Sequence, residues 1–201
     1  MVLPLAVTPA PQEPEKSESV RLLILGDSMS AFSERDEAAF YPGGDVTEES
    51  AMWWAILGDR LPWDMEETAV KALPNVRYSN NPTVFLAMDS LMPDPNTVLL
   101  ALGLDEPADA DAAIAAGLQD ALRVYAATWP EARIILVIPP VATAAEAWDS
   151  AAEAARAQGA QVIDLRESLV SKYPNLYTLD GRHPNAAGMT AIANYIVNQF
   201  R

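Results

Sequence analysis

Two short motifs near opposite ends of the chain contain residues that could carry nucleophilic chemistry. The first is Gly26-Asp27-Ser28, and the second is Asp180-Gly181-Arg182-His183-Pro184. An aspartate three residues before a histidine can hydrogen-bond to the imidazole, which fixes the tautomer and leaves the second ring nitrogen to act as a base. A serine hydroxyl within reach of that base becomes a nucleophile. The residue types therefore predict a triad of Ser28, His183 and Asp180.

Each motif also has an ordinary structural interpretation. Asp27 and Ser28 are residue types that commonly cap helices. His183 is the only histidine in the chain, and a lone histidine is often a hydrogen-bonded residue without a chemical role. The pair Trp53-Trp54 also has two possible interpretations. It could stack on a sugar or acyl group, or pack one ring in the core and the other at the surface.

The elements that must position these residues follow from short apolar runs that alternate with helical patterns. Near-continuous apolar runs are typical of parallel strands covered on both faces. They predict strands at residues 20–25, 97–102 and 133–138, with weaker ones at 76–78 and 161–164. Helical spacing predicts helices over residues 49–61, 111–129, 145–158 and 185–200, with Gly159 as a C-cap and Asn185 as an N-cap.

This alternation predicts an α/β fold, a three-layer α/β/α sandwich with a flavodoxin-like five-stranded parallel sheet in the order 2-1-3-4-5. Polar residues follow the strands in turn: Asp27-Ser28, then Asn80-Asn81, then Asp105-Glu106, and finally Asp180 and His183. The carboxyl ends of parallel strands form one edge of the sheet, so we expect these side chains to converge on one site, with Ser28 in a strand-to-helix turn.

Taken together, the motifs resemble those of the SGNH/GDSL hydrolases, a family of esterases and lipases. Residues 23–28 look like the first block of the family, 95–103 like the strand leading into the third, and 180–184 like the last. The resemblance covers about residues 20–200 and implies Ser28 as nucleophile, His183 as base and Asp180 as the acid that orients it. It also implies an acetyl or short acyl ester as substrate, often on a carbohydrate, and requires no cofactor.

The match departs from the family at the oxyanion hole, which normally uses the serine N–H, a glycine N–H of the second block and an asparagine of the third. Asp105, after Gly103-Leu104, stands where the asparagine is expected, and residues 78–85, which include Asn81, contain no glycine. We assign Asp105, Asn81 and Gly103 to the oxyanion or substrate-binding region. An ionised carboxylate cannot donate a hydrogen bond. Three explanations stay open: a protonated Asp105, an unusual substrate, or weak catalysis.

Composition restricts the partners. The 201 residues carry a net charge of −15, which argues against binding nucleic acid or an anionic membrane. The chain has no cysteine and one histidine, so neither a disulfide nor a zinc site is expected. No apolar run reaches the roughly 18–20 residues that span a bilayer. The N-terminus lacks the basic segment and long apolar stretch of a secretory signal.

The chain divides into an arm and a domain. Residues 1–19 contain four prolines, which favours an extended arm, and residues 20–201 form the hydrolase-like domain. Two functions stay open. The chain is an ester hydrolase that uses the triad, or a weakly active or inactive domain that serves as a binding or structural subunit of a larger assembly, such as a phage particle. In the second case the arm would dock on another subunit.

Overall fold

A computed structural model of the chain describes residues 19–32, 45–140, 145–168 and 170–200. The strands are β1 (Val20–Gly26), β2 (Met65–Ala72), β3 (Thr97–Ala101), β4 (Arg133–Ile138) and β5 (Gln161–Asp164). The α-helices are α1 (Trp53–Arg60), α2 (Asp111–Thr128), α3 (Ala145–Ala157) and α4 (Ala186–Asn198). Short 3-10 helices cover Glu49–Ala51, Val84–Ala87, Leu165–Glu167, Val170–Lys172 and Pro174–Leu176.

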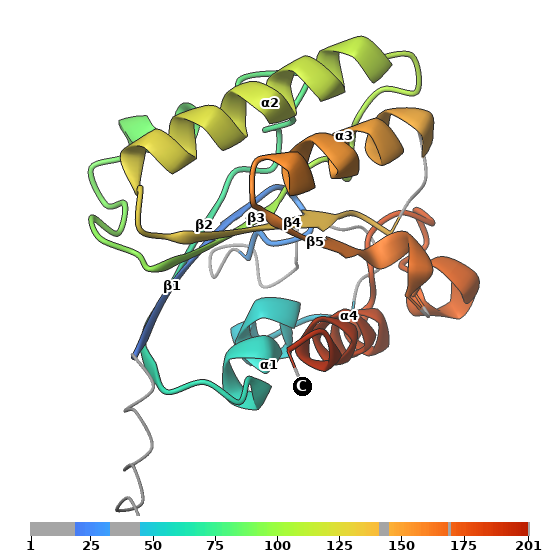
Figure 1. Cartoon of the computed structure of the whole chain (residues 1–201). Helices are drawn as coiled ribbons and strands as arrows, with labels where there is room; N and C mark the ends of the chain where they lie inside the picture. The colour runs from blue at the N-terminus through green and yellow to red at the C-terminus, as the bar shows by residue number, and fades with distance from the viewer. Residues whose placement is uncertain (1–18, 33–44, 141–144, 169, 201) are drawn as a thin grey trace, which may run out of the picture.

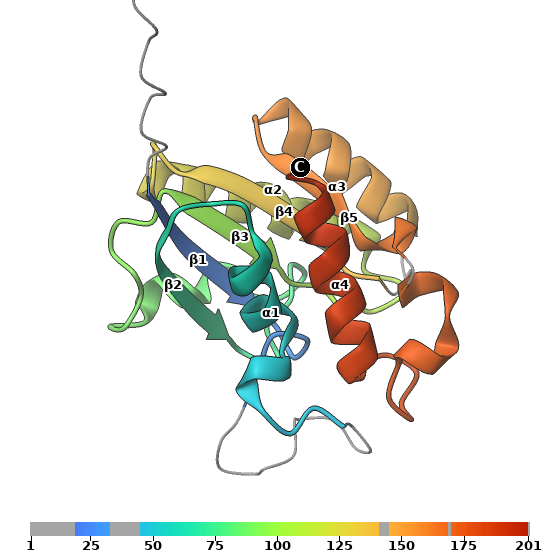
Figure 2. The same cartoon turned by 90° about the horizontal axis from the view of Figure 1, so that it is seen from below.

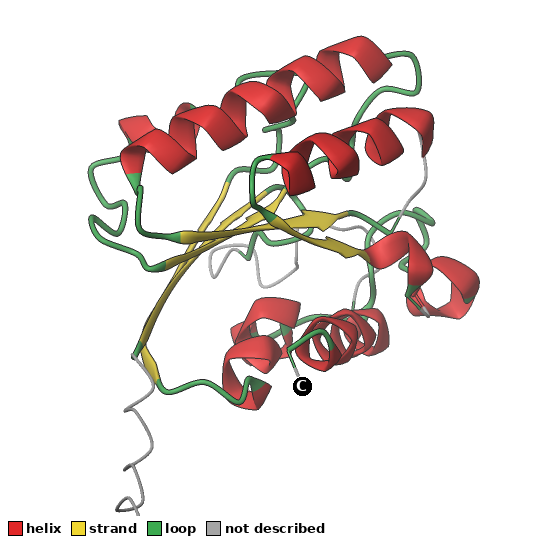
Figure 3. Cartoon of the chain, viewed as in Figure 1, coloured by secondary structure: helices red, strands yellow, loops and turns green. Residues whose placement is uncertain are grey.

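The strands form one sheet between two layers of helices. All neighbours pair in parallel, in the order β2-β1-β3-β4-β5. Helices α2 and α3 cover one face of the sheet, and α1 and α4 cover the other (Figures 1 and 2). Figure 3 shows the same three layers coloured by element type. The predicted α/β/α sandwich and its strand order are confirmed.

The central strands are apolar throughout because each face of the sheet contacts a different core. In β1, Leu22 and Ile24 belong to the cluster on the side of α1 and α4, whereas Leu23 and Leu25 belong to the cluster under α2 and α3. All four side chains have no exposed surface. Full burial of such a side chain contributes about 1.5–3 kcal/mol, so β1 is fixed firmly from both sides. It thereby holds the turn that follows it.

The second strand is not where the sequence predicted it. The prediction of a strand at residues 76–78 is wrong, because β2 runs from Met65 to Ala72. This strand lies at the edge of the sheet, where Glu66, Glu67 and Thr68 are exposed, so it lacks an apolar run. Residues 76–78 instead enter a tight turn in which Tyr78 is buried. Val76 and Tyr78 are apolar because they pack into the core cluster under α2.

The predicted helices are confirmed, with one internal break. The helix predicted over residues 49–61 is a 3-10 turn followed by α1, because Met52 between them adopts an extended backbone (φ −70°, ψ 144°). Gly159 follows α3 with a φ of +83°, as its predicted role as C-cap requires. The Asn185 side chain accepts a hydrogen bond from the Gly188 N–H at the start of α4.

The predicted arm lies outside the described residues, apart from Ser19. In the part of the chain that is described, none of the helices combines the length and the apolar character needed to cross a bilayer.

Candidate active site

Ser28 lies in a tight turn directly after β1. The Ser30 N–H donates to the Asp27 carbonyl over 3.0 Å, and no helix begins before Phe32, where the described segment ends. The expected strand-to-helix turn is therefore a plain hydrogen-bonded turn up to that residue. Ser28 is 5% exposed, so its hydroxyl is held in a largely enclosed position.

Asp180 and His183 are held in one loop by the aspartate carboxylate. Asp180 Oδ1 accepts hydrogen bonds from the backbone N–H groups of Arg182 (2.8 Å) and His183 (2.9 Å) and from Thr178 Oγ1 (2.8 Å). Asp180 Oδ2 lies 2.6 Å from His183 Nδ1. The aspartate thus fixes both the loop backbone and the orientation of the imidazole.

The electrostatics of Asp180 favour its charged form. Partial burial alone would raise its pKa, but the hydrogen bonds from the His183 backbone and imidazole, from Arg182 and from Thr178 outweigh burial and hold it well below its usual range. A carboxylate in this position makes Nδ1 the protonated nitrogen of a neutral imidazole, so Nε2 can accept a proton.

The loop brings His183 to the serine. His183 Nε2 lies 2.9 Å from Ser28 Oγ, and the His183 side chain is 12% exposed. The three residues are thus connected in the order carboxylate, imidazole, hydroxyl, although Ser28 is 155 positions from His183. This arrangement can move a proton from the hydroxyl to the imidazole.

Asp27 links the turn after β1 to the end of β3. Its Oδ2 accepts hydrogen bonds from the N–H groups of Gly103 (2.7 Å) and Leu104 (2.8 Å), and its Oδ1 accepts one from Met29 (3.0 Å). Burial raises the pKa of Asp27 to about 6, although these three N–H groups oppose the shift and Asp105 adds to it. Asp27 therefore fixes Ser28 relative to the loop that carries Asp105.

Asp105 lies beside Ser28, as the sequence predicted. Its Oδ2 is 3.4 Å from Ser28 Oγ, and its Oδ1 is 2.5 Å from Arg182 Nη1. The Asp105 side chain is 20% exposed and that of Arg182 is 46% exposed. The carboxylate that stands in place of an expected donor is therefore compensated by a guanidinium.

The other two residues assigned to the oxyanion region are placed differently. Gly103 has a φ of +103° and donates its N–H to Asp27, and a Cβ at this position would lie 2.5 Å from the Trp148 ring. Its N–H is thus used within the scaffold. Asn81 is exposed with a φ of 55°, and in the described part of the chain no hydrogen bond joins it to Ser28, His183 or Asp105.

Glu106 fixes the turn that follows β2. The residue is 3% exposed, and its Oε1 accepts hydrogen bonds from the N–H groups of Tyr78 (2.6 Å) and Ser79 (3.2 Å). Its Oε2 accepts the Ser79 hydroxyl over 2.5 Å. The loop after β3 therefore holds both the turn after β1, through Asp27, and the turn after β2, through Glu106.

Sequence reasoning missed the contributions of Arg182, Thr178 and Glu106. Arg182 and Thr178 lie within five residues of His183, so proximity was a weak signal, but their contacts depend on how the loop folds back. Glu106 follows Asp105 directly, yet nothing in the sequence indicates that its carboxylate reaches the backbone of Tyr78.

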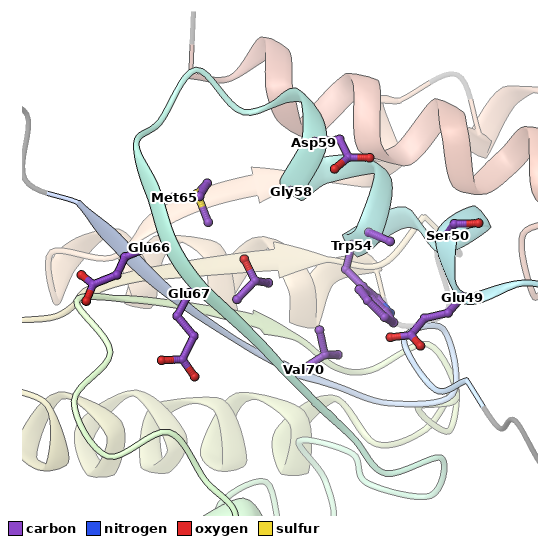
Figure 4. A pocket seen from close by; sticks show the side chains of 11 residues that line it. Glu49, Ser50, Trp54, Gly58, Asp59, Met65, Glu66, Glu67 and Val70 are labelled. Carbon is purple, nitrogen blue, oxygen red and sulfur yellow. The ribbon is translucent and has the colours of Figure 1, made fainter.

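Trp54 lines two cavities, and only the smaller one reaches the turn of Ser28, through Ser30 and Ala31. One, of about 760 Å³, lies between α1 and the edge strand β2 (Figure 4). The other, of about 500 Å³, is lined by Ser30, Phe32, Lys71 and Met88 among others. Trp53 is fully buried and Trp54 is only 9% exposed, so both rings belong to the core, and the expectation that one of them packs at the surface is wrong. Trp54 also lines both cavities and donates its indole N–H to the Ser30 carbonyl over 3.0 Å.

The larger cavity is bordered by acidic side chains, which are Glu49, Asp59, Glu66 and Glu67. Within the residues that the structure describes, no group of histidine, aspartate and glutamate side chains could hold a metal ion.

Comparisons with known proteins find similarity of structure only. No family model matches the sequence, and no curated protein matches it. Among solved structures, the chain is similar to one described as a GDSL-like lipase from Parabacteroides merdae, with a TM-score of 0.70, 14% identity, and coverage of 92% of this chain and 96% of the other.

Two further structures agree. A psychrotrophic esterase from Pseudoalteromonas sp. matches with a TM-score of 0.62 and 16% identity, over 88% of this chain and 94% of the other. A mutant of an acetyl-xylooligosaccharide esterase from Geobacillus matches with a TM-score of 0.65 and 16% identity, over 92% and 95%. The chain therefore has the SGNH/GDSL hydrolase fold.

Proposed function

We propose that this protein is a serine ester hydrolase that removes an acetyl or short acyl group by means of Ser28, His183 and Asp180. The observation that supports it most is the pair of contacts at His183, with Ser28 Oγ 2.9 Å from Nε2 and Asp180 Oδ2 2.6 Å from Nδ1. A hydroxyl and a carboxylate on opposite nitrogens of one imidazole are the arrangement that makes serine a nucleophile.

The first half-reaction forms an acyl-enzyme. Ser28 Oγ attacks the carbonyl carbon while its proton moves to His183 Nε2, and the carbonyl π electrons move onto oxygen. Asp180 stabilises the imidazolium that results. When the tetrahedral intermediate collapses, the bond to the alcohol oxygen breaks, and His183 gives its proton to that alcohol.

The second half-reaction restores the serine. Water attacks the acyl carbon, His183 Nε2 accepts a proton from it, and a second tetrahedral intermediate forms. The bond to Ser28 Oγ then breaks, the serine takes the proton from His183, and the carboxylic acid leaves. Overall, ester and water give acid and alcohol, and the residues return to their starting states.

The substrate class we propose is an acylated carbohydrate. Two observations support it: one structure of the same fold belongs to an acetyl-xylooligosaccharide esterase, and Trp54 lines a cavity that begins next to Ser30 and continues from it into the lining of a second, acidic cavity. An indole face packs well against the apolar face of a sugar ring, and the surrounding carboxylates can accept hydrogen bonds from hydroxyl groups.

The test compares two serines of the same turn. Wild-type protein is assayed on a panel of p-nitrophenyl esters and acetylated oligosaccharides, alongside Ser28→Ala and Ser30→Ala. Ser30 is 1% exposed and its hydroxyl has no partner among the described residues, so its removal should leave the fold and the rate intact. We expect Ser28→Ala to abolish hydrolysis. Equal rates in wild type and Ser28→Ala would place any activity elsewhere.

A second function is favoured by one observation, the Asp105 carboxylate 3.4 Å from Ser28 Oγ. A carboxylate there raises the energy of an oxyanion, as expected of a domain that binds without hydrolysing. In that case the wild type would show no hydrolysis on the whole panel, and a fluorophosphonate probe would not label Ser28.

A further inference from the structure

The environment of Ser28 contains an ion pair, Asp105 with Arg182, at the position where the family resemblance expects an oxyanion donor. Asp105 contacts Ser28 Oγ through one carboxylate oxygen and Arg182 through the other. The carboxylate can only accept hydrogen bonds, so it offers nothing to a developing negative charge. Its partner has the opposite properties, since a guanidinium carries five N–H donors and a permanent positive charge.

Arg182 is held at its backbone, and its side chain is partly exposed. Its backbone N–H donates to Asp180 Oδ1 over 2.8 Å, in the loop that carries His183. Its side chain is 46% exposed and reaches Asp105 through Nη1. Among the described residues, no other arginine or lysine contacts Ser28, Asp105, Asp180 or His183. The guanidinium thus lies one carboxylate group away from the nucleophile.

We propose that Arg182 is the oxyanion donor of this protein and that Asp105 is the residue that positions its guanidinium. The inference rests on the proposed function and names a residue for it. One guanidinium N–H remains on Asp105, and another donates to the substrate oxygen as that oxygen gains charge. The ion pair also cancels the charge of Asp105, so the oxyanion does not face a bare carboxylate.

The role is hydrogen bonding without proton transfer. When Ser28 attacks, the carbonyl π electrons move to oxygen and the serine proton moves to His183. Arg182 keeps all its protons. A donor that gains strength only when charge develops lowers the barrier and leaves ground-state binding almost unchanged. Loss of Arg182 should therefore affect kcat far more than KM.

The experiment measures the loss of kcat in one variant and its recovery in a second. Arg182→Gln should lower kcat on an acetyl ester by about 100-fold or more, with little change in KM, because one oxyanion donor typically has that effect. The double variant Arg182→Gln/Asp105→Asn should recover at least about tenfold of this loss, since an asparagine beside Ser28 donates directly. Arg123→Gln is the matched control, because Arg123 is 70% exposed on α2 and pairs with Asp120.

Two outcomes would overturn the inference. In the first, Arg182→Gln has the same kcat as the wild type. In the second, the double variant Arg182→Gln/Asp105→Asn is no faster than Arg182→Gln. Labelling of Ser28 by a fluorophosphonate, whose P=O oxygen also gains charge, separates this inference from the proposed function. Slower labelling of Arg182→Gln supports the inference even if the wild type hydrolyses no ester. A wild type that neither hydrolyses esters nor labels at Ser28 contradicts both proposals.

Discussion

At the scale of single residues, His183 is defined by what lies on each side of its ring. Asp180 holds Nδ1 and the loop backbone at once, which explains why a residue with a partly exposed side chain (29%) has a pKa well below the usual range. The Asp-x-x-His spacing made this pair predictable, because a four-residue loop closes on itself. The pairing of Asp105 with Arg182 was not predictable, because it joins positions 77 apart through side chains on two loops.

The first prediction at this scale concerns Asp180. Asp180→Asn keeps the size of the side chain but removes the charge that stabilises the imidazolium, so kcat should fall by about 10³- to 10⁴-fold with little change in KM. Steady-state kinetics on an acetyl ester measure this effect. Asp94→Asn is the control, since Asp94 is 73% exposed and pairs with Arg21 and not with Ser28 or His183. A loss of less than about tenfold in Asp180→Asn would contradict the proposed role.

At the scale of elements, three turns at one edge of the sheet are joined to one another. In the loop after β3, the Gly103 N–H donates to Asp27 of the turn after β1. Glu106 of the same loop accepts a hydrogen bond from the Tyr78 N–H in the turn after β2. The central strands were predictable because both of their faces are buried and their sequences are apolar. The edge strand β2 was not, because its exposed charged residues give no apolar run.

Helix α2 approaches the turn after β2 so closely that only glycine fits at the contact. A Cβ on Gly117 would lie 1.7 Å from the Tyr78 carbonyl oxygen, which is backbone and cannot rotate away. Gly117→Ala should therefore lower the free energy of unfolding by about 1–3 kcal/mol or more, because overpacking displaces backbone. It should also lower kcat, since the turn that Glu106 holds would shift.

The control for this prediction lies in another helix. Gly58 in α1 has nothing within 4 Å of its Cβ position, so Gly58→Ala should leave stability unchanged or raise it by up to about 1 kcal/mol. Urea denaturation of both variants measures the difference. Equal stabilities in Gly117→Ala and the wild type would show that α2 can move away from Tyr78 without cost.

At the scale of the whole molecule, the net negative charge and the burial of Asp27 both lower the stability of the fold as the pH rises. The chain carries a net charge of −15, and mutual repulsion among its carboxylates grows as they ionise. Asp27, 2% exposed, has a pKa raised to about 6. The net charge follows directly from the composition of the sequence. The burial of Asp27 was not, because the motif alone does not show that its carboxylate turns toward the N–H groups of Gly103 and Leu104.

The pH dependence of unfolding tests both effects. Between about pH 4 and pH 6 the folded protein binds more protons at Asp27 than the unfolded chain, so the stability that Asp27 contributes at low pH is lost as the pH rises through about 6. This loss amounts to roughly 1.4 kcal/mol between about pH 5 and pH 8, or a fall in Tm of about 3–5 °C. Carboxylates with a lowered pKa, such as Asp180, act below about pH 4, where their stabilisation is lost as the pH falls.

Salt separates repulsion from burial. At about 1 M NaCl the screening length is about 3 Å, so repulsion across the surface is removed, whereas a buried carboxylate is screened far less. We therefore expect Tm to be higher at about pH 5 than at about pH 8 in both salt conditions, with a larger difference at about 0.01 M salt. Calorimetry at the two pH values and two salt concentrations gives both differences. If Tm in high salt is the same at the two pH values, or higher at the more alkaline one, then Asp27 is already ionised at pH 5, and the turn that carries Ser28 is held by a charged acceptor throughout this range.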